Sequence, residues 1–215
     1  MNKSMYSLIL SDDVIDKIDS RAKLMNLSRS GLINQILAEY VSMVTPEQRM
    51  KNLYELIGEQ MNSFANEFRF LLGSGDNAFT AVSALKYKYN PTIRYNVLLY
   101  RSKEHLGEIR ATLRTQNAQL LSDYAQFIKL WLGIERSLTG KNIVCELKGG
   151  VYRRLVDLPS DNTSPDAMAK AITDYIDLFN RSVKLYLSEK GDIDAVCDAI
   201  TRAYISFLKK DRISV

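Results

Sequence analysis

A mixed aromatic and basic stretch between residues 86 and 101 holds the side chains best suited to contact a nucleic acid. Tyrosine rings can stack on bases, while lysine and arginine side chains contact phosphates. The stretch places four cations among four tyrosines, and the cations are Lys86, Lys88, Arg94 and Arg101. Ordinary core tyrosines flanked by surface charges explain the same run equally well. Accessory nucleic-acid contacts at the four cations are therefore one of two open interpretations.

The net charge of +4 is unevenly distributed along the chain. Residues 1–44 hold five basic and five acidic side chains, so their net charge is zero, and the whole excess lies in residues 45–215. Residues 86–114 alone hold seven basic and two acidic side chains, a net charge of +5. A concentrated basic surface is typical of nucleic-acid binders. Here the surplus of positive charge lies outside the first 44 residues.

The sequence lacks the patterns of catalysis and of metal binding. It contains no phosphate-binding glycine loop, no nucleophile elbow and no cluster of metal ligands. Its one histidine is His105, and its two cysteines, Cys145 and Cys197, have no metal or redox spacing. We expect no enzymatic activity, no cofactor and no metal, and a cytoplasmic protein with free thiols. No apolar run is long enough to cross a membrane, and the N-terminus lacks the apolar core of a signal peptide.

Residues 3–44 have the pattern of one strand followed by two capped helices. Ser11 is predicted to cap the first helix and Asn26 to end it, and Ser28 is predicted to cap the second. A strand and two short helices bury too little apolar surface alone, and the strand has open edges, so a second copy is expected to cover them. The strand is predicted from strict alternation, which places Tyr6, Leu8 and Leu10 on one face and Met5, Ser7 and Ile9 on the other.

This pattern resembles the ribbon-helix-helix DNA-binding family, to which the Arc and methionine repressors belong. The most specific parts are Leu-Ser-Asp-Asp-Val-Ile-Asp-Lys-Ile at 10–18 and Leu-Ser-Arg-Ser-Gly-Leu-Ile at 27–33. In that family two chains pair their strands and interlock their helices. The resemblance therefore implies a homodimer, or a higher homo-oligomer, whose partner is double-stranded DNA.

The resemblance also assigns roles to two groups of residues. The outward-facing strand residues would enter the major groove, where Ser7 can hydrogen-bond a base edge while Met5 and Ile9 pack only on thymine methyl groups. The start of the second helix would anchor phosphates through its backbone N–H groups and side chains. The anchoring residues are Ser28, Arg29 and Ser30.

Residues 45–215 are predicted to be mostly helical. Thr45 and Pro46 begin a helix that is expected to end at the loop of residues 73–75. Asn90-Pro91 is either a turn between strands or the start of a helix, and we prefer the helix. Apolar residues at spacings of three and four from 106 to 138 predict one helix of about 35 residues. Its one polar member, Asn117, is either a buried residue that fixes register or a partly solvated one.

The last 70 residues are predicted to begin with a β-hairpin. Residues 143–156 have the pattern of two strands joined by the turn Gly149-Gly150. Ser164 and Pro165 then begin the first of two amphipathic helices, which Gly191 separates. The predicted fold is thus mainly α, with a ribbon-helix-helix domain at 1–44 and a helical domain at 45–215 that carries one small β-hairpin.

The predicted function is sequence-selective binding of double-stranded DNA by a transcriptional regulator that acts as a repressor. The domain of residues 45–215 would add dimer contacts, bind an effector or hold a protein partner, and the sequence does not choose among these roles. Two alternatives stay open. A plasmid relaxosome or partition accessory protein would use the same DNA reader, and a dimeric scaffold would use the fold without binding DNA.

Overall fold

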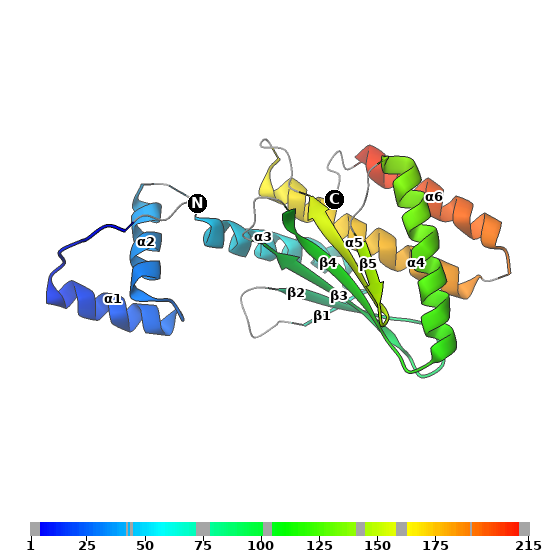
Figure 1. The fold of residues 1–215 in the computed structure, drawn as a ribbon, viewed down its shortest axis with the longest axis horizontal. Helices are drawn as coiled ribbons and strands as arrows, with labels where there is room; N and C mark the ends of the chain where they lie inside the picture. The colour runs from blue at the N-terminus through cyan, green and yellow to red at the C-terminus, as the bar shows by residue number, and fades with distance from the viewer. Residues whose placement is uncertain are drawn as a thin grey trace. The chain divides into compact units, whose positions relative to one another are not determined.

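The computed structural model describes residues 5–41, 43, 45–71, 78–100, 105–140, 145–157, 163–189 and 191–210, and it divides the chain into two compact units, Met1–Arg49 and Met50–Val215. The helices of the described residues are α1 (Asp12–Leu24), α2 (Arg29–Tyr40), α3 (Pro46–Met61), the short 3-10 helix η1 (Asn62–Phe64), α4 (Ala118–Thr139), α5 (Pro165–Ser188) and α6 (Ile193–Lys210) (Figure 1). The strands are β1 (Arg69–Leu71), β2 (Phe79–Ala84), β3 (Thr92–Leu99), β4 (His105–Arg114), β5 (Cys145–Lys148) and β6 (Val151–Asp157).

The prediction of a mainly α chain is wrong, because the second unit contains a six-stranded antiparallel sheet. The strand order is β1-β2-β3-β4-β6-β5. Strands β1 to β4 follow one another across the sheet, and α4 then leads to the β5–β6 hairpin, whose second strand pairs with β4. The second unit is therefore an α/β fold and not a helical domain with one small hairpin.

The segment predicted as one helix from 106 to 138 consists of strand β4 and helix α4. In β4 the core-facing residues are Ile109, Ala111 and Leu113, an alternation that a small alanine side chain makes hard to recognise. Asn117 does not lie in a helical seam. It caps α4, and its Oδ1 accepts a hydrogen bond from the backbone N–H of Leu120 at 3.0 Å.

Two further predictions about this unit are wrong. Helix α3 ends at Met61, where Ser63 Oγ donates a hydrogen bond to the Gln60 carbonyl in competition with the helical pattern. The chain then turns into β1, while the predicted end at residues 73–75 lies outside the described residues. Asn90 and Pro91 lie between β2 and β3 rather than at the start of a helix: the Asn90 N–H closes a turn by donating to the Tyr87 carbonyl at 3.0 Å, and Asn90 has a positive φ of 44°.

The predictions for the C-terminal elements are confirmed. Strands β5 and β6 form the expected hairpin, and Gly149 and Gly150 have the positive φ angles, 57° and 77°, that a two-residue turn of this kind requires. The Ser164 side chain caps α5 by accepting a hydrogen bond from the backbone N–H of Ala167. Helices α5 and α6 follow in the predicted order, with Gly191 between them.

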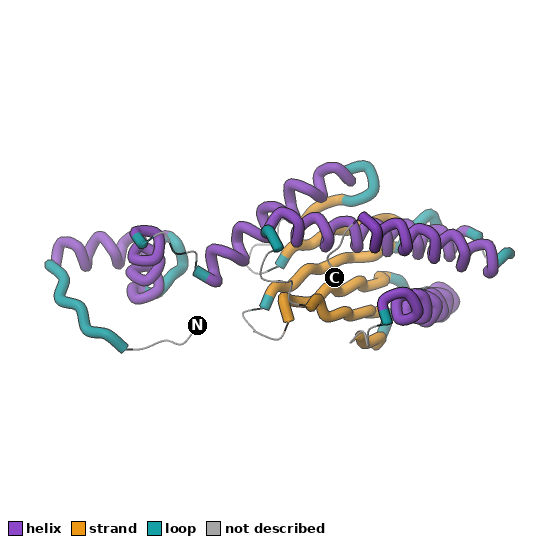
Figure 2. The backbone as a smooth tube through the Cα atoms, turned by 90° about the horizontal axis from the view of Figure 1, so that it is seen from above, coloured by secondary structure: helices purple, strands orange, loops and turns teal. Residues whose placement is uncertain are grey.

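Helices α3, α4 and α5 cover one face of the sheet (Figures 1 and 2). The Tyr124 hydroxyl of α4 donates a hydrogen bond to the carbonyl of Ala111 in β4, and the Tyr95 hydroxyl of β3 donates one to Asn180 of α5. Helix α6 packs outside α4 and α5, where the Tyr204 ring lies edge-on to Trp131 at 5.3 Å. 

A buried ion pair joins the sheet to this helical layer. Arg154 Nε in β6 donates a hydrogen bond to Glu135 Oε1 in α4 at 3.2 Å, and both side chains are almost fully buried. The Tyr204 hydroxyl donates to the same carboxylate oxygen at 2.9 Å, and Tyr152 donates to the other at 3.4 Å. The Arg154 guanidinium also lies 4.9 Å from the centre of the Tyr175 ring. The two charges therefore depend on one another and on three tyrosines.

We expect Glu135→Ala to destabilise the second unit by about 3–5 kcal/mol, because it leaves the Arg154 charge buried and unpaired. Urea denaturation followed by the fluorescence of Trp131, the single tryptophan, measures the loss. Glu55→Ala on the exposed side of α3 is the control and should change the unfolding free energy by less than about 0.5 kcal/mol. Equal effects of the two substitutions would contradict a structural role for the pair.

Candidate nucleic-acid interface

The first unit is built from two helices joined by a tight turn. Asn26 adopts the left-handed conformation with φ 52°, which confirms the prediction that it ends α1. The Ser28 hydroxyl accepts a hydrogen bond from the backbone N–H of Gly31 at 3.1 Å, which confirms it as the cap of α2. Ser11 occupies the extended cap position before α1, although its side chain makes no capping hydrogen bond. The turn and its caps thus fix where α2 begins.

Residues 5–10 do not form a strand within the single chain. A strand is defined by hydrogen bonds to a neighbouring strand, and no described segment of the chain pairs with these residues. Met5 and Ile9, assigned to the DNA-reading face, are 98% and 102% exposed, but Tyr6 and Leu8 on the opposite face are also 85% and 61% exposed. Both faces of this segment are therefore without cover in one copy of the chain.

The two helices also leave most of their apolar side chains uncovered. Within the described residues up to 49, the buried apolar side chains are Ala22, Leu32 and Ala38. Soluble units normally bury most of their large apolar side chains in a core, and apolar surface that stays exposed often marks an interaction site. The exposed large apolar side chains of this unit are Met5, Tyr6, Leu8, Ile9, Val14, Leu24, Met25, Leu27, Ile36, Leu37, Tyr40, Val41 and Met43.

The three residues assigned to phosphate anchoring lie together at the start of α2. The Ser28 and Ser30 hydroxyl oxygens are 3.4 Å apart. Arg29, however, is held by α1, because its Nε donates to Asp19 Oδ1 at 2.6 Å and its Nη2 donates to Asp19 Oδ2 at 2.5 Å. This two-pronged hydrogen bond from Arg29 lowers the pKa of the Asp19 carboxyl. A phosphate that uses Arg29 must compete with Asp19 for it.

Sequence reasoning missed Asp19 as a functional neighbour of Arg29. The sequence does indicate an acidic side on α1, because Asp12, Asp16 and Asp19 recur at helical spacing. The sequence does not show which basic residue meets that side, because the contact depends on how the turn orients α2 against α1.

The structure describes three of the four cations of the mixed aromatic and basic stretch, and they lie on a turn and on the strand that follows it. Lys86 and Lys88 are exposed in the turn between β2 and β3, where Lys88 Nζ lies 5.1 Å from the centre of the exposed Tyr89 ring. Arg94 lies on β3, on the sheet face opposite the helices. Arg101 lies outside the described residues. The cations of this stretch are thus divided between a turn and a sheet surface.

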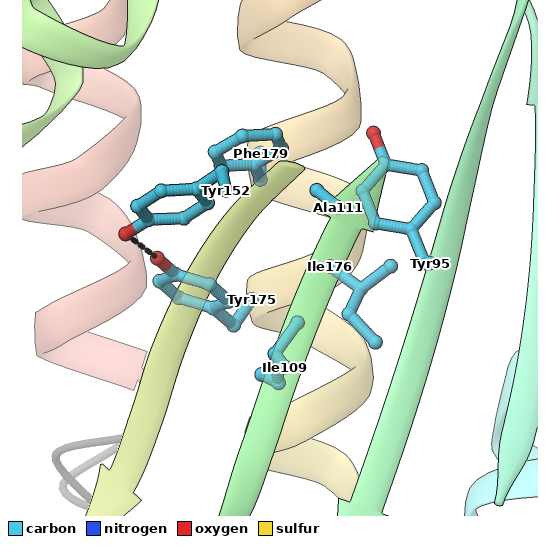
Figure 3. A pocket seen from close by; sticks show the side chains of 7 residues that line it. All are labelled: Tyr95, Ile109, Ala111, Tyr152, Tyr175, Ile176 and Phe179. Atoms are coloured by element: carbon cyan, nitrogen blue, oxygen red, sulfur yellow. Dashed lines mark hydrogen bonds between the residues drawn. The ribbon is translucent and has the colours of Figure 1, made fainter. Parts of the chain in front are cut away.

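Tyr95, one of the tyrosines of this stretch, belongs to the core. It is almost fully buried, and its hydroxyl donates a hydrogen bond to Asn180. With Ile109, Ala111 and Tyr152 of the sheet and with Tyr175, Ile176 and Phe179 of α5, Tyr95 lines a small gap (Figure 3). The gap leaves no room for a water molecule, so it is a packing gap and not a ligand site.

Other kinds of site find no support in the described residues. These residues contain no group of three or more His, Cys, Asp or Glu side chains arranged to hold a metal ion. None of their helices is both long and apolar enough to span a membrane. Comparison of the chain with protein-family models, curated proteins and solved structures gave no match.

We expect the pKa of Asp19 to lie below its ordinary value of 3.8 and to rise toward that value in Arg29→Gln, because the substitution removes the hydrogen bonds that favour the carboxylate. Carboxyl chemical shifts measured by NMR during an acid titration give this pKa. The stability contributed by the pair is present above pH 3.8 and is lost as the pH falls through the lowered pKa. Arg21→Gln is the control, and a shift of the Asp19 pKa in that variant would contradict the assignment to Arg29.

Proposed function

We propose that this chain is a cytoplasmic, sequence-selective double-stranded DNA-binding protein that acts as a homodimeric transcriptional regulator, with residues 1–44 as its reader. The observation that carries the proposal is the first unit itself. It combines an N-terminal segment without secondary structure and two helices with an apolar surface that one chain leaves exposed, and it does so at the spacing of the ribbon-helix-helix pattern.

Pairing of two copies through residues 5–10 would remove this exposure. Antiparallel pairing of the two segments satisfies their backbone N–H and C=O groups and turns Tyr6, Leu8 and Leu10 toward the helices. Full burial of one leucine side chain contributes about 1.5–3 kcal/mol. Leu8 and Leu37 are 61% and 50% exposed, so burial of their remaining surface in both copies would contribute roughly 3–7 kcal/mol toward the entropic cost of association.

The same pairing leaves Met5, Ser7 and Ile9 on the outer face of the ribbon. A two-stranded ribbon fits the major groove of DNA. Ser7 can donate or accept a hydrogen bond at a base edge, and the two apolar side chains favour contact with thymine methyl groups. The reader is therefore poor in hydrogen bonds to bases, and its selectivity is expected to rest on few contacts at each half-site.

Phosphate contacts in this reader would come from the start of α2. The backbone N–H groups there and the hydroxyl of Ser30 are donors suited to an anion, and Arg29 adds a guanidinium once a phosphate displaces Asp19. Because residues 1–44 have no net charge, the reader alone has little long-range attraction for DNA.

We expect the purified protein to bind the DNA upstream of its own gene more tightly than a scrambled duplex, measured by fluorescence anisotropy at two salt concentrations. Ser7→Ala should reduce the preference for the specific sequence by roughly 30-fold, because the dimer loses one hydrogen bond of about 1 kcal/mol at each of its two half-sites. Arg29→Ala should weaken binding to all sequences alike and reduce the salt dependence by about one phosphate contact per chain. Unchanged affinity in both variants would show that these residues are not the reader.

The dimer is tested by two substitutions on opposite faces of the same segment. Leu8→Asp should abolish the dimer in sedimentation equilibrium, because it places a carboxylate in the proposed apolar interface. Ile9→Asp is the matched control on the outer face, and it should leave the protein dimeric. Equal behaviour of the two variants would contradict pairing through residues 5–10, and a dimer that binds no DNA would leave a scaffold as the function of the unit.

A further inference from the structure

The sheet face opposite the helices carries a row of residues that spans all six strands. The residues Tyr95, Ala111 and Tyr152 face α5, so their neighbours Arg94, Thr112 and Val151 face the other way. Strand pairing places these residues side by side in one row. In strand order the row is Arg69, Val82, Arg94, Thr112, Val151 and Lys148.

Further cations border this row at one end of the sheet. Arg114 pairs with Thr92 in the neighbouring row, and Lys86 and Lys88 follow β2 in the adjoining turn. We call the resulting surface the basic band. Its cations are Arg69, Arg94, Arg114, Lys148, Lys86 and Lys88.

Among the described residues, no carboxylate forms an ion pair with any of the six cations of the basic band. Arg110 and Arg153, two residues further along their strands on the same face, both pair with the buried carboxylate of Glu108. Arg94 Nε is buried and has no hydrogen-bond partner. The same face therefore contains neutralised arginines and a separate band whose positive charge is available to an anion.

The shape and chemistry of the basic band favour the backbone of a duplex. Five strand intervals of about 4.8 Å give the row a length of roughly 24 Å, the distance over which one DNA strand presents about seven phosphates. The six residues of the row include the hydroxyl of Thr112 and the aliphatic side chains of Val82 and Val151 but no aromatic side chain, whereas the exposed ring of Tyr89 lies beside Lys88 in the adjoining turn.

We propose that the basic band binds the phosphates of double-stranded DNA as a second contact that is independent of base sequence. The inference rests on the proposed function, because DNA is taken as the partner of the first unit. It also accounts for the charge distribution. Residues 1–44 have no net charge to attract DNA, and the excess lies in residues 45–215, to which the basic band belongs.

The test replaces three cations of the basic band in the full-length protein, as Arg94→Gln, Arg114→Gln and Lys148→Gln together. The matched control removes the same charge from the exposed sides of α4 and α6, as Lys129→Gln, Arg202→Gln and Lys209→Gln. Binding to a duplex of about 40 base pairs is measured by anisotropy over a range of salt concentrations. Trp131 fluorescence confirms that each variant is folded.

We expect the triple variant of the basic band to bind specific and unrelated duplexes more weakly by the same factor. The slope of log K against log salt should become shallower by about 0.9 for each lost phosphate contact, up to roughly 2.7 per chain. The control variant should keep the wild-type affinity and slope.

The outcomes separate this inference from the proposed function. If the triple variant matches the control while Arg29→Ala still weakens binding, the basic band is not a DNA contact and the reader stands. If the triple variant loses affinity while Arg29→Ala does not, the basic band is a DNA contact and the assignment of residues 1–44 as the reader is wrong. Single-stranded DNA and polyglutamate are tested as competitors, and either one competing as well as duplex DNA would overturn the assignment of the basic band to duplex DNA. If the wild-type protein binds no DNA, the proposed function and the role of the basic band are both overturned.

Discussion

The second unit depends on the packing of one side chain, Phe179 of α5, against aromatic rings from three different elements. Its ring centre lies 6.1 Å from Tyr95 of β3, 5.3 Å from Tyr152 of β6, and 5.3 Å and 5.2 Å from Phe127 and Trp131 of α4. Aromatic pairs in these arrangements contribute about 0.5–1.5 kcal/mol each beyond the burial of their surface. A single position thus ties α5 and α4 to two strands that are not neighbours in sequence.

This packing also explains why the two faces of the sheet can have opposite characters. The face that the helices cover is lined mostly by apolar side chains, whereas the opposite face carries Arg69, Arg94, Arg114 and Lys148. A charge on the covered face is costly: Arg154 is compensated there by the carboxylate of Glu135 and by neighbouring tyrosines. Arg114, on the uncovered face, is exposed to solvent and needs no such partner.

The sequence predicted local features of the fold better than its class. Caps at Ser28 and Ser164, the left-handed Asn26 and the Gly-Gly turn depend on the preferences of a few adjacent residues, and all of them were correct. Strands β1 to β4 were missed because a helix and a strand share apolar residues at some spacings. In β4 the pair Ile109 and Leu113 fits a helical turn as well as a strand.

The candidate site was predictable to the extent that it is local. The cap and hydroxyls at the start of α2 follow from three adjacent residues, but the bond between Arg29 and Asp19 depends on the angle between two helices. The row from Arg69 on β1 to Lys148 on β5 gathers residues that are up to 82 positions apart in sequence, and only the strand order aligns them. No local pattern of charge reveals such a row, because no strand contributes more than one cation to it.

The lengths of the two outermost strands have a consequence for how copies of this chain associate. In the described sheet, β1 has three residues and β5 has four, so each edge offers few unpaired backbone groups to a neighbouring molecule. Growth of the sheet from one molecule to the next is therefore disfavoured at both ends. Residues 5–10 are a longer described segment without a strand partner, and in the proposed dimer their two-fold pairing would close on itself and stop at two copies.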